Sequence, residues 1–313
     1  MENLQGIEIY RFGKSIAPHL ALPVYLLKHN YDILVNDLRH AILWIFATIL
    51  NKHNIVFFHH LHARSLQGQI NPLFAYVIKA IERCYFIIYH KTVFVTESST
   101  SKNDLLKLGI QEKEIIMNPP GVDFKMFHPA AKTQYPTLVY FRGMRRYKRP
   151  QEILLLLKCL MEKMKNVKLF IIGSGPEEPK LRKLASELSL LDFAIFNGRV
   201  SDIELSNIVT SAWLNIHTSV TEGWGYSILE ASAAETPTIA NDVPGVRDAV
   251  EDEINGIKVR DGDRKALLDA AFSILSNPEK WWSSSVEVAK KYSWDKTAEQ
   301  WETLIRKITK NHS

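Results

Sequence analysis

The second half of the chain alternates short apolar runs with amphipathic segments. The apolar runs have the length of buried strands and cover residues 137–141, 167–172, 193–197, 212–217 and 237–240. Segments with the spacing of amphipathic helices separate these runs. In residues 150–164, for example, apolar residues recur every three or four positions, and Ile153, Leu156, Leu157 and Leu160 share one helix face. Strands that alternate with helices in this way indicate a parallel sheet that is covered on both faces.

The first part of the chain shows the same two kinds of segment, less regularly. The strands that we predict there are residues 7–10, 33–35, 55–58, 92–96 and 115–118. Residues 41–50 and 72–89 predict helices, and residues 294–308 predict a final amphipathic helix. This part is therefore also expected to be α/β.

Length and composition favour two domains. The 313 residues exceed what a single core usually organises. Residues 118–137 contain four prolines and a glycine, which is typical of a linker. We expect domains at residues 1–128 and 129–293, followed by a C-terminal helix at residues 294–313.

The composition is that of a soluble globular protein. Apolar residues make up 46% and charged residues 23%, which excludes a disordered chain, a collagen-like repeat and a disulfide scaffold. Cys84 and Cys159 form no CxxC or Cys/His cluster, so we expect a reducing compartment and no zinc site. The longest apolar stretch, residues 41–50, is too short to span a bilayer, and no secretory signal is visible. These features predict a cytoplasmic protein, at most peripheral at a membrane.

The net charge of +5 is mildly basic. It fits an anionic ligand or a membrane surface and does not require nucleic acid. Because the basic residues are not interleaved with aromatic residues, nucleic acid is the weaker interpretation.

The strongest chemical signal is the segment EGWGYSILE at residues 222–230, which follows a predicted strand and opens a predicted helix. Gly223 and Gly225 leave backbone N–H groups accessible where the helix dipole favours an anion such as a diphosphate. Glu222 and Glu230 bracket the segment, and carboxylates suit the paired hydroxyls of sugars and ribose. The alternative is an ordinary helix start with two acidic residues.

A second signal is the basic segment RGMRRYKRP at residues 142–150, with five Arg or Lys residues in eight positions. It follows a predicted strand, so its charge lies at the carboxyl end of the sheet, where such folds bind ligands. Arg and Lys there would pair with phosphate oxygens. A solvated basic loop is the alternative.

Two glycine turns and a histidine cluster are weaker signals. Residues 173–176 (GSGP) lack the third glycine of a dinucleotide motif, and residues 197–200 (NGRV) form a similar turn. His59, His60 and His62 have no acidic or cysteine partner nearby in the sequence, so a metal site is the weaker interpretation. One histidine at the end of a strand, facing a cleft, is the better one.

Taken in order, these segments resemble the retaining glycosyltransferases of family 4, the group 1 enzymes with GT-B architecture. The resemblance is most specific at residues 222–231 (EGWGYSILEA), at Thr236-Pro237 and at residues 243–248 (VPGVRD). Shorter supporting matches lie at residues 31–32, 59–61, 96–98, 121–123, 148–150, 173–176 and 198–200. The resemblance covers nearly the whole chain and is weaker in the first part.

The resemblance implies two Rossmann-like domains whose parallel sheets face each other across a cleft. The second domain would bind a nucleoside-diphosphate sugar and the first an acceptor, with the final helix crossing back to the first domain. By motif position Glu230 would hold the ribose hydroxyls and Glu222 the transferred sugar. His59 aligns with a cleft histidine near that sugar.

The other site residues follow from the resemblance in the same way. Lys148, with Arg142 or Arg145, would neutralise the diphosphate. Further donor contacts are implied at Gly223, Trp224, Gly225, Tyr226, Ser227, Gly173, Arg199 and Val200. Cations and a helix N-terminus would stabilise the leaving group, and a donor phosphate oxygen would take the acceptor proton, so we expect no metal and no other cofactor.

The chain departs from the family pattern in three places. Arg142-Gly143 reverses the usual Gly-Arg order, which makes Arg145 the alternative phosphate ligand. Glu235 stands where a glycine commonly ends the glutamate helix, so we expect a locally different helix end. The opening strand and the glycine-rich loop of the first domain have no counterpart, so we expect that domain to be incomplete.

These departures keep a second hypothesis open. The chain would then be a non-catalytic nucleotide-sugar-binding pseudoenzyme, or a subunit that needs a partner chain to supply N-terminal elements. A sugar-nucleotide epimerase is a third reading, although the complete glutamate motif favours transfer. The donor sugar, its base and the acceptor, whether sugar, lipid or protein, stay open, as does attachment to a membrane surface.

Overall fold

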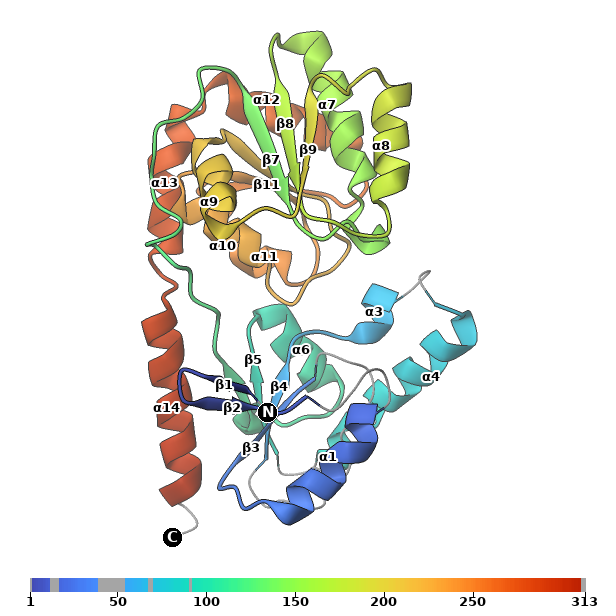
Figure 1. The fold of residues 1–313 in the computed structure, drawn as a ribbon, viewed down its shortest axis with the longest axis vertical. Helices are drawn as coiled ribbons and strands as arrows, with labels where there is room; N and C mark the ends of the chain where they lie inside the picture. Colours follow the sequence, from blue (N-terminus) through green and yellow to red (C-terminus); the bar gives the residue numbers. More distant parts are fainter. Residues whose placement is uncertain (1, 12–16, 39–53, 67–69, 90–91, 311–313) are drawn as a thin grey trace.

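Two parallel sheets, one above the other along the long axis, form the centres of the two halves of the molecule (Figure 1). The computed structural model describes residues 2–11, 17–38, 54–66, 70–89 and 92–310. The predicted helix at 41–50 lies outside these residues. None of the described helices is long and apolar enough to cross a membrane.

The second domain is a six-stranded sheet in the order β12-β11-β10-β7-β8-β9. All its neighbouring strands are parallel, and they are β7 (Thr137–Phe141), β8 (Lys168–Ile172), β9 (Ala194–Gly198), β10 (Leu214–His217), β11 (Thr238–Asn241) and β12 (Gly256–Val259). The chain starts in the middle of the sheet at β7 and builds outward on both sides. The strand order therefore reverses between β7 and β10, and α/β folds bind ligands at the carboxyl ends of strands at such a point.

Two hydrophobic cores cover the two faces of this sheet. The core of one face takes its helical side chains from α7 (Gln151–Lys163), α8 (Glu178–Glu187), α12 (Arg264–Ser276) and α13 (Glu279–Ala289). The core of the other face is built by α9 (Asp202–Ser211), α10 (Tyr226–Ala233) and α11 (Val246–Ala249). The predicted one-sided face of α7 is confirmed, because Ile153, Leu156, Leu157 and Leu160 are all buried.

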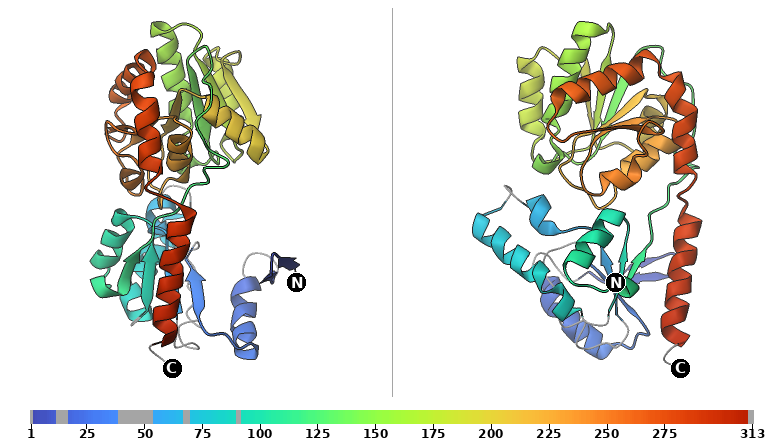
Figure 2. Two further views of the ribbon diagram at one scale, coloured as in Figure 1. Left: turned by 90° about the vertical axis from the view of Figure 1, so that its left-hand side faces the viewer. Right: turned by 180° about the vertical axis from the view of Figure 1, so that it is seen from behind.

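The first domain holds a four-stranded parallel sheet in simple order: β3 (Leu34–Asp37), β4 (Asn54–Phe58), β5 (Val93–Thr96) and β6 (Ile115–Met117). Its helices are α1 (Ala17–Lys28), α3 (His62–Leu66), α4 (Pro72–Arg83), α5 (Tyr85–Ile88) and α6 (Ser99–Lys107). The last helix, α14 (Trp294–Lys310), belongs to this half, because Leu304 packs against Ile55 and Val95. Figure 2 shows α14 running along the first domain below α13.

The chain passes between the domains twice, and the two passages lie side by side. Val122 pairs with Ser293, and Asn118 Nδ2 donates to the carbonyl of Thr297 at 3.1 Å. A side chain at Gly121 would place its Cβ 2.1 Å from the backbone nitrogen of Trp294. Glycine is therefore required where the two passages meet.

The structure corrects the sequence analysis in the first domain. The strand predicted at 7–10 is β2 (Ile7–Ile9), which pairs antiparallel with β1 (Glu2–Leu4) in a separate hairpin and joins neither parallel sheet. Gln5 and Gly6 form its turn with positive φ angles of 52° and 88°, as a tight hairpin turn requires. The single helix predicted at 72–89 is broken at Cys84, which lets Tyr85 and Tyr89 turn into the core.

Candidate active site

The candidate site is an open cavity of about 590 Å³ between the two domains. It lies where the order of the second sheet reverses, beyond the carboxyl ends of β7 and β10. The first domain contributes His59, His60, His62 and Glu97, and the second contributes Arg145, Tyr147, Glu222, Gly223, Trp224 and Tyr226. Each domain forms one wall of this cavity. We name the walls after the ligands that the family resemblance predicts for each domain: the donor wall (second domain) and the acceptor wall (first domain).

The donor wall is organised around the Glu222 carboxylate. Lys148 Nζ lies 3.2 Å and Arg142 Nη1 lies 3.9 Å from Glu222 Oε1, and the Ser219 hydroxyl donates to the same oxygen at 2.7 Å. Burial by itself would raise the pKa of Glu222, but Lys148, Arg142 and His217 outweigh it and lower this pKa to about 2. Glu222 is therefore ionised at neutral pH and holds both cations in place.

Several hydrogen-bond donors of this wall have no protein partner among the described residues. Arg142 Nε and Nη2 and the Ser227 hydroxyl are buried and have no hydrogen-bond partner there. The Arg142 side chain as a whole is only 7% exposed. At the N-terminus of α10, Gly225 has a φ of 107°, and no described side chain caps the helix. Because buried donors are normally satisfied, this group of N–H and O–H atoms indicates an anionic ligand.

Glu230 lies on α10 within the field of the same arginine. Burial raises the pKa of its carboxyl group, and Arg142 opposes that rise. Glu230 is therefore a largely buried carboxyl group whose ionised form the charge of Arg142 favours.

The acceptor wall is organised around a cation held by two carboxylates. His59 Nδ1 lies 3.0 Å from Glu97 Oε2, and His59 Nε2 lies 2.8 Å from Asp37 Oδ1. Burial would lower the pKa of His59, but the hydrogen bonds to Asp37 and Glu97 outweigh it and raise this pKa to about 9. At neutral pH His59 is therefore an imidazolium that donates to both carboxylates.

The two domains touch beside the cavity at several points. The Tyr226 hydroxyl of the second domain donates to Glu97 Oε1, and a Cβ at Gly223 would lie 3.4 Å from both His59 and Glu97. Further along, the Asp248 carboxylate accepts the Ser99 N–H at 2.9 Å and the Thr100 hydroxyl at 3.3 Å. This carboxylate thereby lies at the N-terminus of α6, where the helix dipole stabilises it.

Comparison with known proteins assigns the family. The sequence profile described as glycosyl transferases group 1 matches residues 122–292, more than half of the chain. The chain belongs to the group 1 glycosyl transferases. The sequence-based resemblance is confirmed at this level.

Relatives and solved structures agree with the assignment. The chain is 25% identical to an uncharacterized glycosyltransferase of Methanocaldococcus jannaschii over 96% of this chain and 84% of that protein. It is 32% identical to phosphatidyl-myo-inositol mannosyltransferase of Mycobacterium leprae over 58% of this chain and half of that protein. Sucrose-phosphate synthase of Thermosynechococcus elongatus superposes with a TM-score of 0.77 at 20% identity, covering 93% of this chain and 77% of that one.

A second solved neighbour is Anabaena HepE in complex with UDP and glucose. It superposes with a TM-score of 0.76 at 16% identity and covers 95% of this chain and 84% of that one. These neighbours confirm the predicted fold class, two parallel-sheet domains in the GT-B arrangement.

Six of the predicted site residues of this glycosyl transferase line the cavity: His59, Arg145, Glu222, Gly223, Trp224 and Tyr226. Lys148 and Arg142 pair with Glu222. Gly225, Ser227 and Glu230 are not among the lining residues, and neither are Gly173, Arg199 and Val200. Gly173 has a φ of 122°, and a Cβ there would lie 2.2 Å from the carbonyl oxygen of Arg142, so glycine is needed for loop packing. Arg199 Nε donates to the Ser174 hydroxyl at 3.0 Å, and Val200 packs against the core of the second domain. Their proposed contacts with the base stay predictions.

The expected change at the end of α10 is not observed. Glu235 adopts a φ of 54°, the left-handed conformation that a glycine takes at this position. The Glu235 N–H bonds to the carbonyl of Ser232, and the Thr236 N–H bonds to that of Ala231. This is a Schellman motif, formed here by a residue that has to adopt an unfavourable backbone conformation.

The sequence analysis missed both carboxylates of the acceptor wall as site residues. Asp37 and Glu97 are far apart in the sequence. Asp37 ends β3 and Glu97 follows β5, and these two strands flank β4, which His59 follows. The strand predicted at 33–35 stopped two residues before Asp37. Polar residues at the carboxyl ends of three neighbouring parallel strands were the signal that could have found them.

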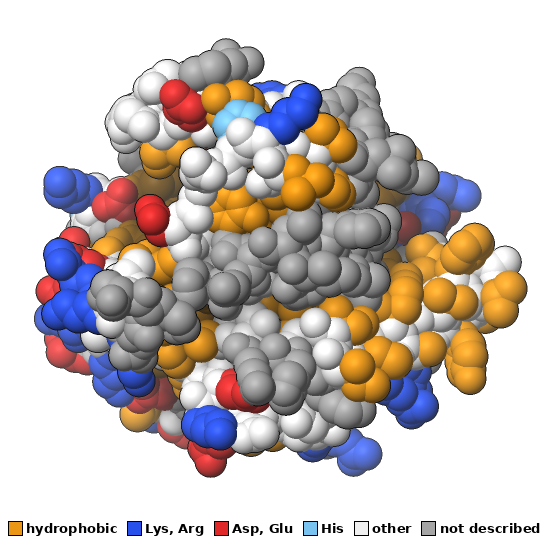
Figure 3. Space-filling view, turned by 90° about the horizontal axis from the view of Figure 1, so that it is seen from below, with side chains coloured by type: hydrophobic (Ala, Val, Ile, Leu, Met, Phe, Trp, Pro, Cys, Tyr) orange, Lys and Arg blue, Asp and Glu red, His pale blue; other side chains and the backbone are white. Residues whose placement is uncertain are grey.

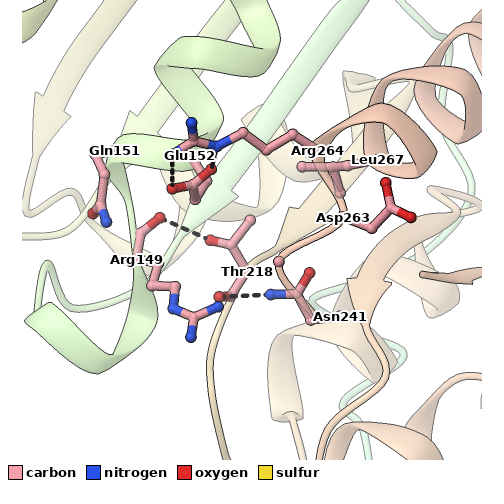
Figure 4. Close-up of a pocket in the computed structure, with 9 residues that line it drawn as sticks. Arg149, Gln151, Glu152, Thr218, Asn241, Asp263, Arg264 and Leu267 are labelled. Atoms are coloured by element: carbon pink, nitrogen blue, oxygen red, sulfur yellow. Dashed lines mark hydrogen bonds and ion pairs between the residues drawn. The ribbon is translucent and has the colours of Figure 1, made fainter. Parts of the chain in front are cut away.

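A second cavity, of about 310 Å³, lies within the second domain and is lined by Arg149, Glu152, Thr218, Asn241 and Arg264, among others (Figure 4). Its charged groups already pair with one another: Arg149 with Asp261 at 2.5 Å and Arg264 with Glu152 at 2.6 Å. The Thr218 hydroxyl donates to the Arg149 carbonyl at 3.1 Å, and Asn241 donates to the Thr218 carbonyl at 3.0 Å (Figure 4). Since these partners satisfy one another, this cavity offers much less to an anion than the donor wall does. Within the described residues, no group of three His, Cys, Asp or Glu side chains is arranged to hold a metal ion.

Proposed function

We propose that this group 1 glycosyl transferase moves a sugar from a nucleoside-diphosphate sugar to an acceptor, with retention of configuration and without a metal ion. The observation that carries the proposal is the buried, unpartnered guanidinium edge of Arg142 beside Lys148 and the uncapped start of α10. A diphosphate would satisfy all these donors at once. The similar fold of Anabaena HepE, whose structure contains UDP and glucose, supports this ligand class.

The same residues explain how the leaving group is stabilised. As the bond between the sugar C1 and the diphosphate oxygen breaks, negative charge grows on the diphosphate, and Lys148, Arg142 and the N-terminus of α10 lie where they oppose it. Burial lowers the pKa of Lys148 even though Glu222 opposes this, so its charge is poorly hydrated and interacts strongly. In this proposal Glu222 also binds the transferred sugar and Glu230 the ribose.

The acceptor hydroxyl attacks from the face that the diphosphate leaves. Its proton passes to a phosphate oxygen of the donor, and the new C1–O bond replaces the old one on the same side. His59 does not serve as the base, because it already carries its second proton at neutral pH. It instead places a fixed positive charge near the sugar, while both of its N–H groups stay bonded to Asp37 and Glu97.

Transfer is tested by incubating the protein with UDP-, GDP- and ADP-sugars and a panel of sugar and lipid acceptors, with EDTA present. We expect one nucleotide series to be turned over, with NMR showing the anomeric configuration of the donor in the product. Nucleotide binding without turnover of any donor would favour the pseudoenzyme hypothesis. Donor conversion that needs no acceptor would favour an epimerase, and an inverted product would refute the retaining mechanism.

We further propose that the acceptor is presented at a membrane surface. Helix α4 exposes Leu73, Phe74, Tyr76 and Val77 to solvent, and Lys79 and Arg83 are exposed on the same helix. Figure 3 shows hydrophobic side chains gathered at the right-hand margin of this end of the molecule, with basic side chains beside them. An apolar face flanked by cations is typical of a helix that lies in the lipid headgroup region.

The inner face of α4 is anchored to the acceptor side of the site. Its one acidic residue, Glu82, is buried and accepts the N–H groups of His62 and Ala63 at the start of α3, with the His62 bond at 2.5 Å. A groove of about 660 Å³ runs between α3 and α4 and is lined by Leu61, Tyr76, Lys79 and Arg83. Leu61 stands between His60 and His62 in the sequence, and these two histidines line the active-site cavity, so the segment after β4 contributes to both the groove and the cavity.

Co-sedimentation with vesicles of 70% phosphatidylcholine and 30% phosphatidylglycerol tests this surface. We expect the wild type to bind and the double variant Phe74→Ser/Tyr76→Ser to stay in the supernatant. Ile203→Ser, which changes a single exposed side chain of α9, is the matched control and should bind like the wild type. Light scattering that shows a dimer lost in the double variant, without vesicle binding by the wild type, would assign the face to a second copy instead.

A further inference from the structure

Glu97 is a buried carboxylate whose two oxygens accept hydrogen bonds from different domains. It follows β5 and is 2% exposed. Its Oε2 pairs with His59 Nδ1 of its own domain at 3.0 Å, while its Oε1 accepts the Tyr226 hydroxyl of the second domain. The sequence analysis gave this residue no role in the site.

This arrangement ties the state of His59 to the position of the donor segment. A buried carboxylate is costly unless it is paired and hydrogen-bonded, and here both partners are needed to satisfy it. Tyr226 follows Gly225 at the start of α10, and Gly223 packs directly against His59 and Glu97. If the second domain moved away, Glu97 would lose the Tyr226 hydroxyl and water would reach the pair.

We propose that Glu97 is a positioning residue that holds His59 as an imidazolium facing the transferred sugar and does so fully only when the donor segment has closed on the first domain. The inference rests on the proposed function for the sugar itself. Glu97 acts on the reaction through His59 and need not touch the substrate.

The groups around His59 support this assignment. Asp37 at the end of β3 and Glu97 after β5 both raise the pKa of His59, and the neighbouring His60 is neutral because burial lowers its pKa to about 4. The Phe57 ring packs edge-on at 4.5 Å and carries no charge. Glu97 is therefore one of only two charged groups, among the described residues, that hydrogen-bond to the imidazole.

The test compares Glu97→Gln with Tyr226→Phe in two measurements. The first is the pKa of His59, from NMR titration of protein with ¹⁵N-labelled histidine. The second is the pH profile of kcat and kcat/KM for transfer. Glu97→Gln keeps the size and one hydrogen bond but removes the charge, so we expect the pKa of His59 to fall by roughly 1–3 units. The alkaline limb of the rate profile should move down with it, and kcat at pH 8 should fall by roughly 2- to 90-fold, in proportion to the loss of protonated His59.

Tyr226→Phe is the matched control, because it removes the bond between the domains and leaves the charge of Glu97 in place. We expect it to raise the donor KM severalfold and to shift the pH profile in the same direction as Glu97→Gln, but by a smaller amount. An active wild type whose Glu97→Gln variant has an unchanged profile and an unchanged pKa of His59 would overturn the proposal. So would a Tyr226→Phe variant whose profile shifts as far as that of Glu97→Gln. A wild type that turns over no sugar nucleotide is a different outcome and counts against the proposed function.

Discussion

The two walls of the cleft have opposite electrostatic designs. On the donor wall, two cations converge on one carboxylate, and part of the buried Arg142 guanidinium has no protein partner. On the acceptor wall, two carboxylates converge on one cation, and both nitrogens of His59 are bonded. The comparison indicates that the second domain has donors for an anionic ligand that are unpaired among the described residues, whereas the first domain pairs its own charged group, His59, with its own carboxylates.

The largest expected effect tests the donor wall. Arg142→Lys keeps the charge but cannot present the two unpartnered N–H groups, so kcat/KM should fall by roughly 10²–10³-fold, as when one donor is removed from a preorganised site. Arg182→Lys, on the surface of α8, is the control and should change kcat/KM less than twofold. A loss below threefold in Arg142→Lys would show that the guanidinium edge is not the anion site.

The next effect tests the acceptor wall through stability. Because the pKa of His59 is raised from 6.5 to about 9 in the folded chain, its contribution is complete below pH 6.5 and is lost as the pH rises through 9. The difference of about 2.5 pKa units corresponds to about 3 kcal/mol.

Urea unfolding at pH 6 and at pH 9.5, for the wild type and for His59→Gln, measures this contribution. The difference between the two proteins isolates the histidine, since Lys132, whose pKa burial lowers to about 7, acts in the opposite direction over the same range. Equal pH dependence in both proteins would contradict the paired imidazolium.

A smaller effect tests whether Lys132 stabilises the C-terminal end of α10, the helix whose N-terminus belongs to the donor wall. The Lys132 ammonium donates to the carbonyls of Thr210 and Ala234 at 2.9 and 2.8 Å and thereby caps the C-terminal ends of α9 and α10. Lys132→Met would leave these carbonyls without that donor, so the free energy of unfolding should fall by about 2 kcal/mol. Lys180→Met, at an exposed site, should leave it within about 0.5 kcal/mol of the wild type. An unchanged stability in Lys132→Met would mean that water replaces the lysine without cost.

The smallest effect concerns the end of the same helix. Glu235→Gly removes the penalty of a left-handed backbone at a residue with a side chain, and thermal unfolding should show a gain of about 1 kcal/mol. Donor binding should not change, because Glu235 lies at the opposite end of α10 from the site. A loss of stability would show that the Glu235 side chain contributes more than its backbone costs.

The difference between the walls also explains what the sequence revealed. Residues 222–230 and 142–150 are continuous segments, and their glycines, carboxylates and cations identify the donor wall before any fold is known. Asp37, His59 and Glu97 come from three strands separated by long connections, so only the sheet brings them together. His59 alone was predicted, from the family resemblance.

The fold shows the same division. The strands and helices up to residue 250 in the second domain follow strong apolar periods and were predicted well, although β12, α12 and α13 were not identified. In the first domain, the antiparallel hairpin of β1 and β2 and the break at Cys84 depend on tertiary packing and on turn residues that periodicity does not report.

Isothermal titration of UDP, GDP and ADP into the wild type and into Arg142→Lys, with EDTA present, tests the donor wall most directly. We expect one of these nucleoside diphosphates to bind the wild type with one molecule per chain, and Arg142→Lys to bind it at least tenfold more weakly while it unfolds at the same temperature as the wild type. If none of the three binds the wild type, or if Arg142→Lys binds as tightly, the donor wall is not a diphosphate site.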